Sequence, residues 1–123
     1  MLDKIIFQKL DVLQTEKFPF KTKFDFIVSN PPYISIDEYK LLEPELKYEP
    51  ITALTDFNDG FSFYRKIINI SKKILKKDGI VAFEVSYNQA EIIKKMFLEN
   101  DYYDIRVIKD YSNIERIIMG KLK

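Results

Sequence analysis

A short apolar run that ends in two prolines constrains the fold of this chain more than any other feature. Residues Phe24–Ser29 are almost continuously apolar, which is typical of a parallel strand covered on both faces. Asn30 follows this run, and Pro31 and Pro32 come next. Neither proline has a backbone N–H group, so neither can continue a strand ladder. The pattern therefore predicts a buried strand that ends at Asn30 and opens into a stiff loop.

The rest of the chain predicts alternating helices and strands. Apolar residues recur with helical spacing over 61–77, and Asp78-Gly79 carries the glycine signal of a helix end. The other predicted elements are a strand at 80–85, a helix at 88–99, and two closing strands at 104–109 and 114–120. We expect the first strands to be parallel, with right-handed crossovers, and the last pair to form an antiparallel hairpin. The predicted fold class is α/β.

Three segments are less regular. Residues 5–7 read either as a short strand or as a frayed tail, and residues 10–23 read as a loop. Residues 34–59 carry two prolines and many charges, with one short helix predicted at 36–42. A loop of this length inside a compact domain is more often functional than idle.

Composition bounds the possible functions. A chain of 123 residues forms one domain or part of a larger one. It has no cysteine and no histidine, which excludes disulfides, thiolate and imidazole metal sites, and histidine catalysis. Its formal net charge of +1 gives no footprint for long nucleic acid. No apolar run approaches the roughly 20 residues of a membrane span, and no signal-peptide pattern is visible, so we expect a cytoplasmic protein without a membrane partner.

The loop Asn30-Pro31-Pro32-Tyr33, called the Asn30–Tyr33 loop below, points to chemistry on an amino group. The Asn30 side-chain oxygen and the Pro31 carbonyl can both accept hydrogen bonds from one –NH2 group. Holding both hydrogens favours a pyramidal nitrogen whose lone pair is directed at an electrophile, so acceleration comes from positioning and electrostatics. Tyr33 can stack on a planar target or face a cationic sulfonium. The alternative is that the loop simply ends a strand.

At these residues the chain resembles the amino-methyltransferases that use S-adenosylmethionine. That group includes adenine-N6 DNA, guanine-N2 RNA and protein glutamine-N5 methyltransferases. Further matches single out the release-factor glutamine methyltransferases (HemK type). These matches lie at Phe26–Ile34, Tyr48-Glu49-Pro50, Ala53-Leu54, Asp59-Gly60, Glu84-Val85 with Gln89, Lys109-Asp110 and Arg116. Ser86 departs from this pattern, because the family usually has glycine there.

The resemblance implies a partial Rossmann-like class I methyltransferase fold, the C-terminal half of a mostly parallel sheet closed by an antiparallel hairpin. It also implies that Asn30, Pro31, Pro32 and Tyr33 form the catalytic loop and contact the target glutamine. By the same resemblance Asp11, Val12 and Asn30 contact S-adenosylmethionine, while Glu49 and Pro50 shape the target pocket. For Glu49 the alternative is a solvated loop carboxylate. For Glu84, Asp110 and Arg116 we expect structural roles in strand-end capping and ion pairing.

One expected part of such an enzyme is missing from this sequence. The cofactor normally lies on a glycine-rich turn, but the three glycines here, Gly60, Gly79 and Gly120, are far apart. We therefore expect the catalytic-loop portion of a methyltransferase, with an incomplete cofactor site and no activity in isolation. The strand at 24–29 then becomes an apolar edge, which favours a homodimer, aggregation or dependence on the missing N-terminal half.

The leading interpretation is methylation of a glutamine side-chain amide in a peptide chain release factor. One alternative is an adenine-N6 or guanine-N2 methyltransferase acting on nucleic acid, which requires a flipped base; the balanced charge makes a nucleic-acid partner the weaker expectation. Another alternative is a non-catalytic assembly module that retains the fold.

Overall fold

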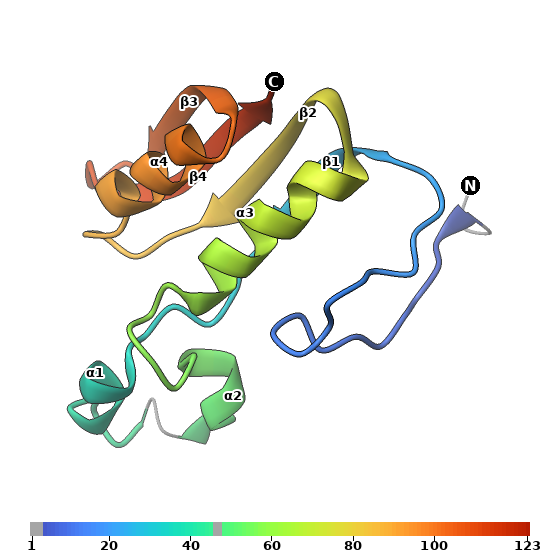
Figure 1. The fold of residues 1–123 in the computed structure, drawn as a ribbon. Helices are drawn as coiled ribbons and strands as arrows, with labels where there is room; N and C mark the ends of the chain where they lie inside the picture. Colours follow the sequence, from blue (N-terminus) through green and yellow to red (C-terminus); the bar gives the residue numbers. More distant parts are fainter. Residues whose placement is uncertain (1–3, 46–47) are drawn as a thin grey trace.

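The computed structural model describes residues 4–45 and 48–123. These residues form a four-stranded sheet of order β1-β2-β4-β3 with two longer helices, α3 and α4, beside it (Figure 1). Rings from both helices pack on the same β2 side chain, Phe83, because Tyr64 of α3 and Phe97 of α4 lie 4.9 and 5.8 Å from it between ring centroids. Both helices therefore cover the same face of the sheet.

The parallel part of the sheet is as the sequence predicts. Strand β1 (Phe24–Ser29) pairs in parallel with β2 (Leu75–Glu84), and the register runs from Phe26 opposite Ile80 to Ser29 opposite Phe83. The connection between them contains α3 (Ser62–Ile74). Because this pairing places the carboxyl ends of both strands at one edge, Asn30 emerges beside the end of β2.

The predicted closing hairpin is also confirmed. Strands β3 (Tyr102–Lys109) and β4 (Glu115–Leu122) are antiparallel, and β4 also pairs antiparallel with β2. The turn between them is held by Asp110, whose Oδ1 accepts hydrogen bonds from the amides of Ser112 at 2.8 Å and Ile114 at 3.0 Å. The Arg116 guanidinium pairs with the other oxygen of Asp110 at 2.8 Å. The structural roles expected of Asp110 and Arg116 are thus observed.

One predicted boundary is wrong. Helix α3 ends at Ile74, not at Lys77, and Leu75 already pairs with Phe24 of β1. The next pair is Phe26 with Ile80, so the intervening β2 residues bulge out of the ladder. It is Asp78, with φ of +65°, and not Gly79, that takes the left-handed conformation. The Asp-Gly pair therefore marks a turn inside the strand and not a helix cap.

The irregular region before α3 contains two short helices. Helix α1 (Ile36–Lys40) lies within the predicted range and is capped by the Ser35 side chain, whereas α2 (Ile51–Leu54) was not predicted. Helix α4 (Ala90–Glu99) begins two residues later than expected. Residues 5–7 form no strand and are exposed, in agreement with the frayed-tail alternative.

The core between the helices and the sheet combines aliphatic side chains with a row of four aromatic ones. These four rings are all buried, and each packs on the next in the order Tyr64, Phe83, Phe97, Tyr102. The β1 edge differs, because Phe26 is 59% and Val28 74% exposed. The expected apolar edge strand is therefore present in the sheet formed by the described residues. No helix among those residues is both long and apolar enough to cross a membrane.

Candidate functional site

The Asn30–Tyr33 loop leaves β1 at the carboxyl end of the parallel pair. Asn30 is exposed, Pro31 is buried, and Pro32 and Tyr33 are half-buried. The loop therefore buries Pro31 and presents Asn30 outward. It is not turned into the core.

Two small cavities meet at Asn30. The first, of about 180 Å³, is lined by Asn30, Pro31, Tyr33 and Glu49, together with Ile34, Ala53 and Leu54. The second, of about 210 Å³, is lined by Asn30, Ser29 and Glu84, together with Val28, Ala82, Phe83 and Ile117. A residue between two cavities can contact two different molecules, which is the role that the resemblance implies for Asn30.

Helix α2 brings Glu49 to the loop. Pro50 is the residue at the N-terminal boundary of α2, and the amide of Ile34 donates a 3.0 Å hydrogen bond to the carbonyl of Leu54 at its other end. Residues 34 and 55 also form an isolated bridge. Pro50 and Pro32 line neither cavity.

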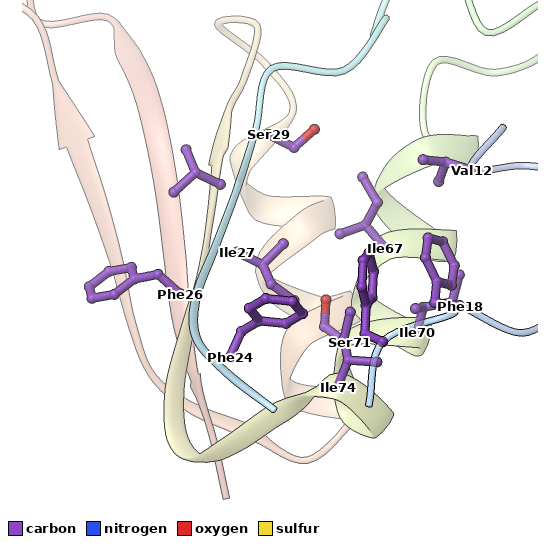
Figure 2. Close-up of a pocket in the computed structure, with 12 residues that line it drawn as sticks. Val12, Phe18, Phe24, Phe26, Ile27, Ser29, Ile67, Ile70, Ser71 and Ile74 are labelled. Atoms are coloured by element: carbon purple, nitrogen blue, oxygen red, sulfur yellow. The ribbon is translucent and has the colours of Figure 1, made fainter. Parts of the chain in front are cut away.

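The predicted cofactor residues Asp11 and Val12 lie elsewhere. Val12 lines a separate apolar cavity of about 360 Å³ between β1 and α3 (Figure 2). In that view Phe24 and Ile27 point from β1 toward α3, whereas Phe26 points to the opposite side of the strand. Asp11 lines none of the five described cavities. Its Oδ1 accepts hydrogen bonds from the amides of residues 13 and 14, at 3.1 and 3.3 Å.

Ser29 joins the two regions, because it lines both the Val12 cavity and the larger Asn30 cavity. The structure thus brings Asn30, Pro31, Tyr33 and Glu49 together around one space. It does not bring Asp11 or Val12 to that space.

Residues for which the sequence predicts no role contact the Asn30–Tyr33 loop at the Tyr33 carbonyl. The Gln89 carboxamide donates to the Tyr33 carbonyl at 2.9 Å. Gly60 lies against the same carbonyl, and its amide is held by the buried Asp56 carboxylate at 3.0 Å. Gly60 and Gln89 lie in segments that resemble the release-factor glutamine methyltransferases, but nothing in the sequence indicates that they meet at Tyr33. No sequence pattern points to Asp56.

Electrostatics near the loop are set by burial and one ion pair. Burial raises the pKa of the Tyr64 hydroxyl, and the nearby Tyr33 and Glu84 side chains raise it further. The hydrogen bond with Asp110 raises the pKa of Arg116, and the same guanidinium lowers the pKa of Asp110. Tyr64 is therefore a permanent neutral donor, while Arg116 is a permanent cation close to the loop.

Comparison with known proteins places the chain among methyltransferases. Residues 3–119 match the sequence model of the family described as Eco57I restriction-modification methylase. Over 100 residues the chain is 48% identical to a release factor glutamine methyltransferase of Fusobacterium nucleatum subsp. nucleatum. This match covers 80% of the chain but 28% of the relative, so the chain spans well under half of that protein's length.

Solved structures agree on the fold. A methyltransferase from Pyrococcus furiosus matches with a TM-score of 0.57 at 19% identity, over 83% of this chain and 42% of that one. A release-factor-specific protein-(glutamine-N5) methyltransferase from Alicyclobacillus acidocaldarius matches with a TM-score of 0.51 at 25% identity, over 82% and 50%. The expected partial class I methyltransferase fold is confirmed, and its sheet is mixed, with one parallel pair.

The family model matches almost the whole chain, and the Asn30–Tyr33 loop lies at the carboxyl end of a parallel strand. The relatives reported above are methyltransferases as well. The chain therefore belongs to the Eco57I-type methylase family of methyltransferases.

Proposed function

We propose that this chain carries the catalytic loop of an S-adenosylmethionine-dependent methyltransferase that acts on a glutamine side-chain amide of a peptide chain release factor. The observation that carries the proposal is the position of Asn30, which is exposed and lies between two cavities at the end of β1. The similarity to release factor glutamine methyltransferases supports glutamine as the target.

The chemistry follows from the two acceptors of the loop. The Asn30 side-chain oxygen and the Pro31 carbonyl accept the two N–H bonds of the target amide, while Tyr33 packs on its plane and Pro32 keeps the loop rigid. Glu49 lines the space that receives the glutamine, and Pro50 follows it at the N-terminal boundary of α2. S-adenosylmethionine supplies an electrophilic methyl group. As the nitrogen–carbon bond forms and the sulfur–carbon bond breaks, the nitrogen releases one proton to water, so no strong base is needed.

The residues assigned to the cofactor fit part of such a molecule. Val12 offers an apolar surface, and Asp11 uses Oδ1 for its local turn, which leaves Oδ2 as an acceptor for an amino group of the adenine. Asn30 is the contact with the reactive end. No cluster of glycines accompanies them, so we propose that the cofactor site is incomplete without a glycine-rich half. The expected result is that calorimetry of the isolated chain detects no micromolar binding of S-adenosylmethionine.

A second candidate is an amino-methyltransferase for adenine or guanine in nucleic acid. The description of the matched family, a restriction-modification methylase, favours it. Both candidates use the same loop, so the acceptor alone separates them.

The test measures transfer of labelled methyl from S-adenosylmethionine to two acceptors. These are a release factor bearing its glutamine and an adenine-containing single-stranded oligonucleotide. The chain is assayed alone and together with the glycine-rich half of a full-length relative. We expect transfer to the release factor only in the mixture, and its loss by about 100-fold or more in Asn30→Ala, given the weight of positioning and electrostatic groups in catalysis.

Asn69→Ala, an exposed change on α3, is the matched control and keeps full activity. Transfer to the oligonucleotide in place of the release factor would establish the second candidate. If neither acceptor is methylated and no cofactor binds even in the mixture, the chain is a non-catalytic assembly module.

A further inference from the structure

Gln89 is a buried side chain with hydrogen-bond partners at both ends of its carboxamide. It is 5% exposed. Its Nε2 donates to the carbonyls of Tyr33 at 2.9 Å and Gly60 at 3.5 Å. Its Oε1 accepts from the amide of Ser86 at 3.0 Å and from the Tyr64 hydroxyl at 3.4 Å. Because carbonyl oxygens only accept, this environment fixes which end of the carboxamide faces the loop.

The contact is made to one particular peptide unit. The Tyr33 carbonyl and the Ile34 amide belong to the same planar group. Gln89 holds the carbonyl side, and the Leu54 carbonyl accepts from the Ile34 amide at 3.0 Å. The unit is thereby fixed from both sides.

Gly60 closes the remaining space. Its φ of +91° suits glycine, and a Cβ atom placed on it would lie 2.6 Å from the Tyr33 carbonyl oxygen. The Tyr33 carbonyl is therefore packed against backbone on one side and bonded to Gln89 on another. Residues 33, 60 and 89, which are far apart in the sequence, therefore meet at this carbonyl.

We infer that Gln89 is a positioning residue that sets the direction of the Asn30–Tyr33 loop by holding the Tyr33 carbonyl. The expected effect of Gln89 on methyl transfer rests on the proposed function, whereas its contact with the loop does not. Pro31 and Pro32 have no N–H groups, so the loop has few backbone bonds of its own. Its orientation must be fixed at its far end, where the Gln89 side chain donates a hydrogen bond to the Tyr33 carbonyl.

The test compares Gln89→Met and Gln89→Glu with the matched control Gln8→Met, which alters an exposed glutamine. Amide hydrogen exchange is measured by NMR at Ile34 and at amides of β4. In Gln89→Met we expect exchange at Ile34 to rise about tenfold over that at β4. That factor corresponds to a hydrogen-bond free energy of about 1.4 kcal/mol. Gln8→Met should leave Ile34 as protected as in the unmodified chain.

Gln89→Glu adds a pH profile that mere packing would not produce. An ionised carboxylate cannot donate to the Tyr33 carbonyl, whereas its protonated form can. We expect Ile34 protection to be reduced at pH 8 and to recover toward that of the unmodified chain at pH 5. In Gln89→Met the reduction is the same at both pH values. Comparing each variant with the unmodified chain at the same pH cancels titration of the neighbouring acids Asp56 and Glu84.

Equal protection of Ile34 in Gln89→Met and Gln8→Met would overturn the inference, as would a loss spread evenly over Ile34 and β4. If Gln89→Met does not fold, the pH profile of Gln89→Glu decides, and a flat profile overturns it. Methyl transfer is assayed in parallel in the mixture with the glycine-rich half, where we expect the turnover number to fall about tenfold with the cofactor KM unchanged. An unmodified chain that transfers no methyl group refutes the proposed function and leaves the exchange result standing.

Discussion

Replacing Tyr64 by Phe removes one buried hydroxyl and leaves the aromatic packing intact. The ring of Tyr64 is fully buried and meets Phe83 edge to face at 4.9 Å, and phenylalanine can keep both properties. The hydroxyl donates to the carbonyl of Glu84 at 2.8 Å and more weakly to Gln89 at 3.4 Å. The variant therefore leaves the Glu84 carbonyl, at the end of β2, without this donor.

An acceptor left without its partner costs about 1–3 kcal/mol, and the lower half of that range applies because this carbonyl is only partly buried. We expect the free energy of unfolding to fall by about 1–2 kcal/mol. That is a sizeable part of the roughly 5–15 kcal/mol typical of a domain. Urea unfolding followed by circular dichroism measures the change, with an unaltered dependence on urea concentration showing that the folded and unfolded states keep their compactness.

Tyr111→Phe is the matched control, because Tyr111 is fully exposed. The same chemical change there should alter the free energy of unfolding by less than about 0.5 kcal/mol. Equal effects of the two substitutions would refute the reasoning, since it attributes the difference to the partly buried bond with Glu84.

Two further predictions concern alkaline pH and the edge strand. Burial raises the pKa of Tyr64 and Tyr102, so above about pH 10 the unfolded chain releases protons that the folded chain retains. The free energy of unfolding should then fall by up to ~1.4 kcal/mol per pH unit for each tyrosine. Urea titration measures this fall, which should be less steep in Tyr64→Phe; an equally steep fall in that variant would contradict a contribution from Tyr64. We also expect concentration-dependent association through the exposed β1 edge, weakened about tenfold or more by Phe26→Glu; light scattering that shows a monomer at every concentration would exclude it.

The parts of the fold that follow from sequence are those with a strong local signal. Pro31 and Pro32 end β1 where two missing N–H groups require it. The hairpin is visible because two apolar runs flank Tyr111-Ser112-Asn113, and Asp110 supplies the carboxylate that closes the turn. Both signals depend on residues close to one another in the chain, so no tertiary contact is needed to interpret them.

The boundary between α3 and β2 could not be obtained in this way. Lys76 and Lys77 continue the helical pattern, but Leu75 pairs with Phe24, about fifty residues away in sequence, and this contact ends the helix early. Tertiary pairing here overrides local propensity. The later turn is also misleading, because Asp78 takes the positive φ that the sequence suggests for Gly79.

The candidate site likewise contains a part that local sequence predicts and a part that depends on long-range contacts. Its reactive groups are contiguous, so Asn30, Pro31 and Tyr33 could be named from the sequence, and the structure gathers them around one cavity with Glu49. Its main support is not contiguous with the loop, since the Gln89 side chain reaches the Tyr33 carbonyl across 56 positions, and Gly60, which lies against the same carbonyl, is 27 positions from Tyr33. A loop with two prolines cannot bond itself into place, so these distant groups must orient it. Changing one of them should alter the rate of a reaction whose atoms it never touches.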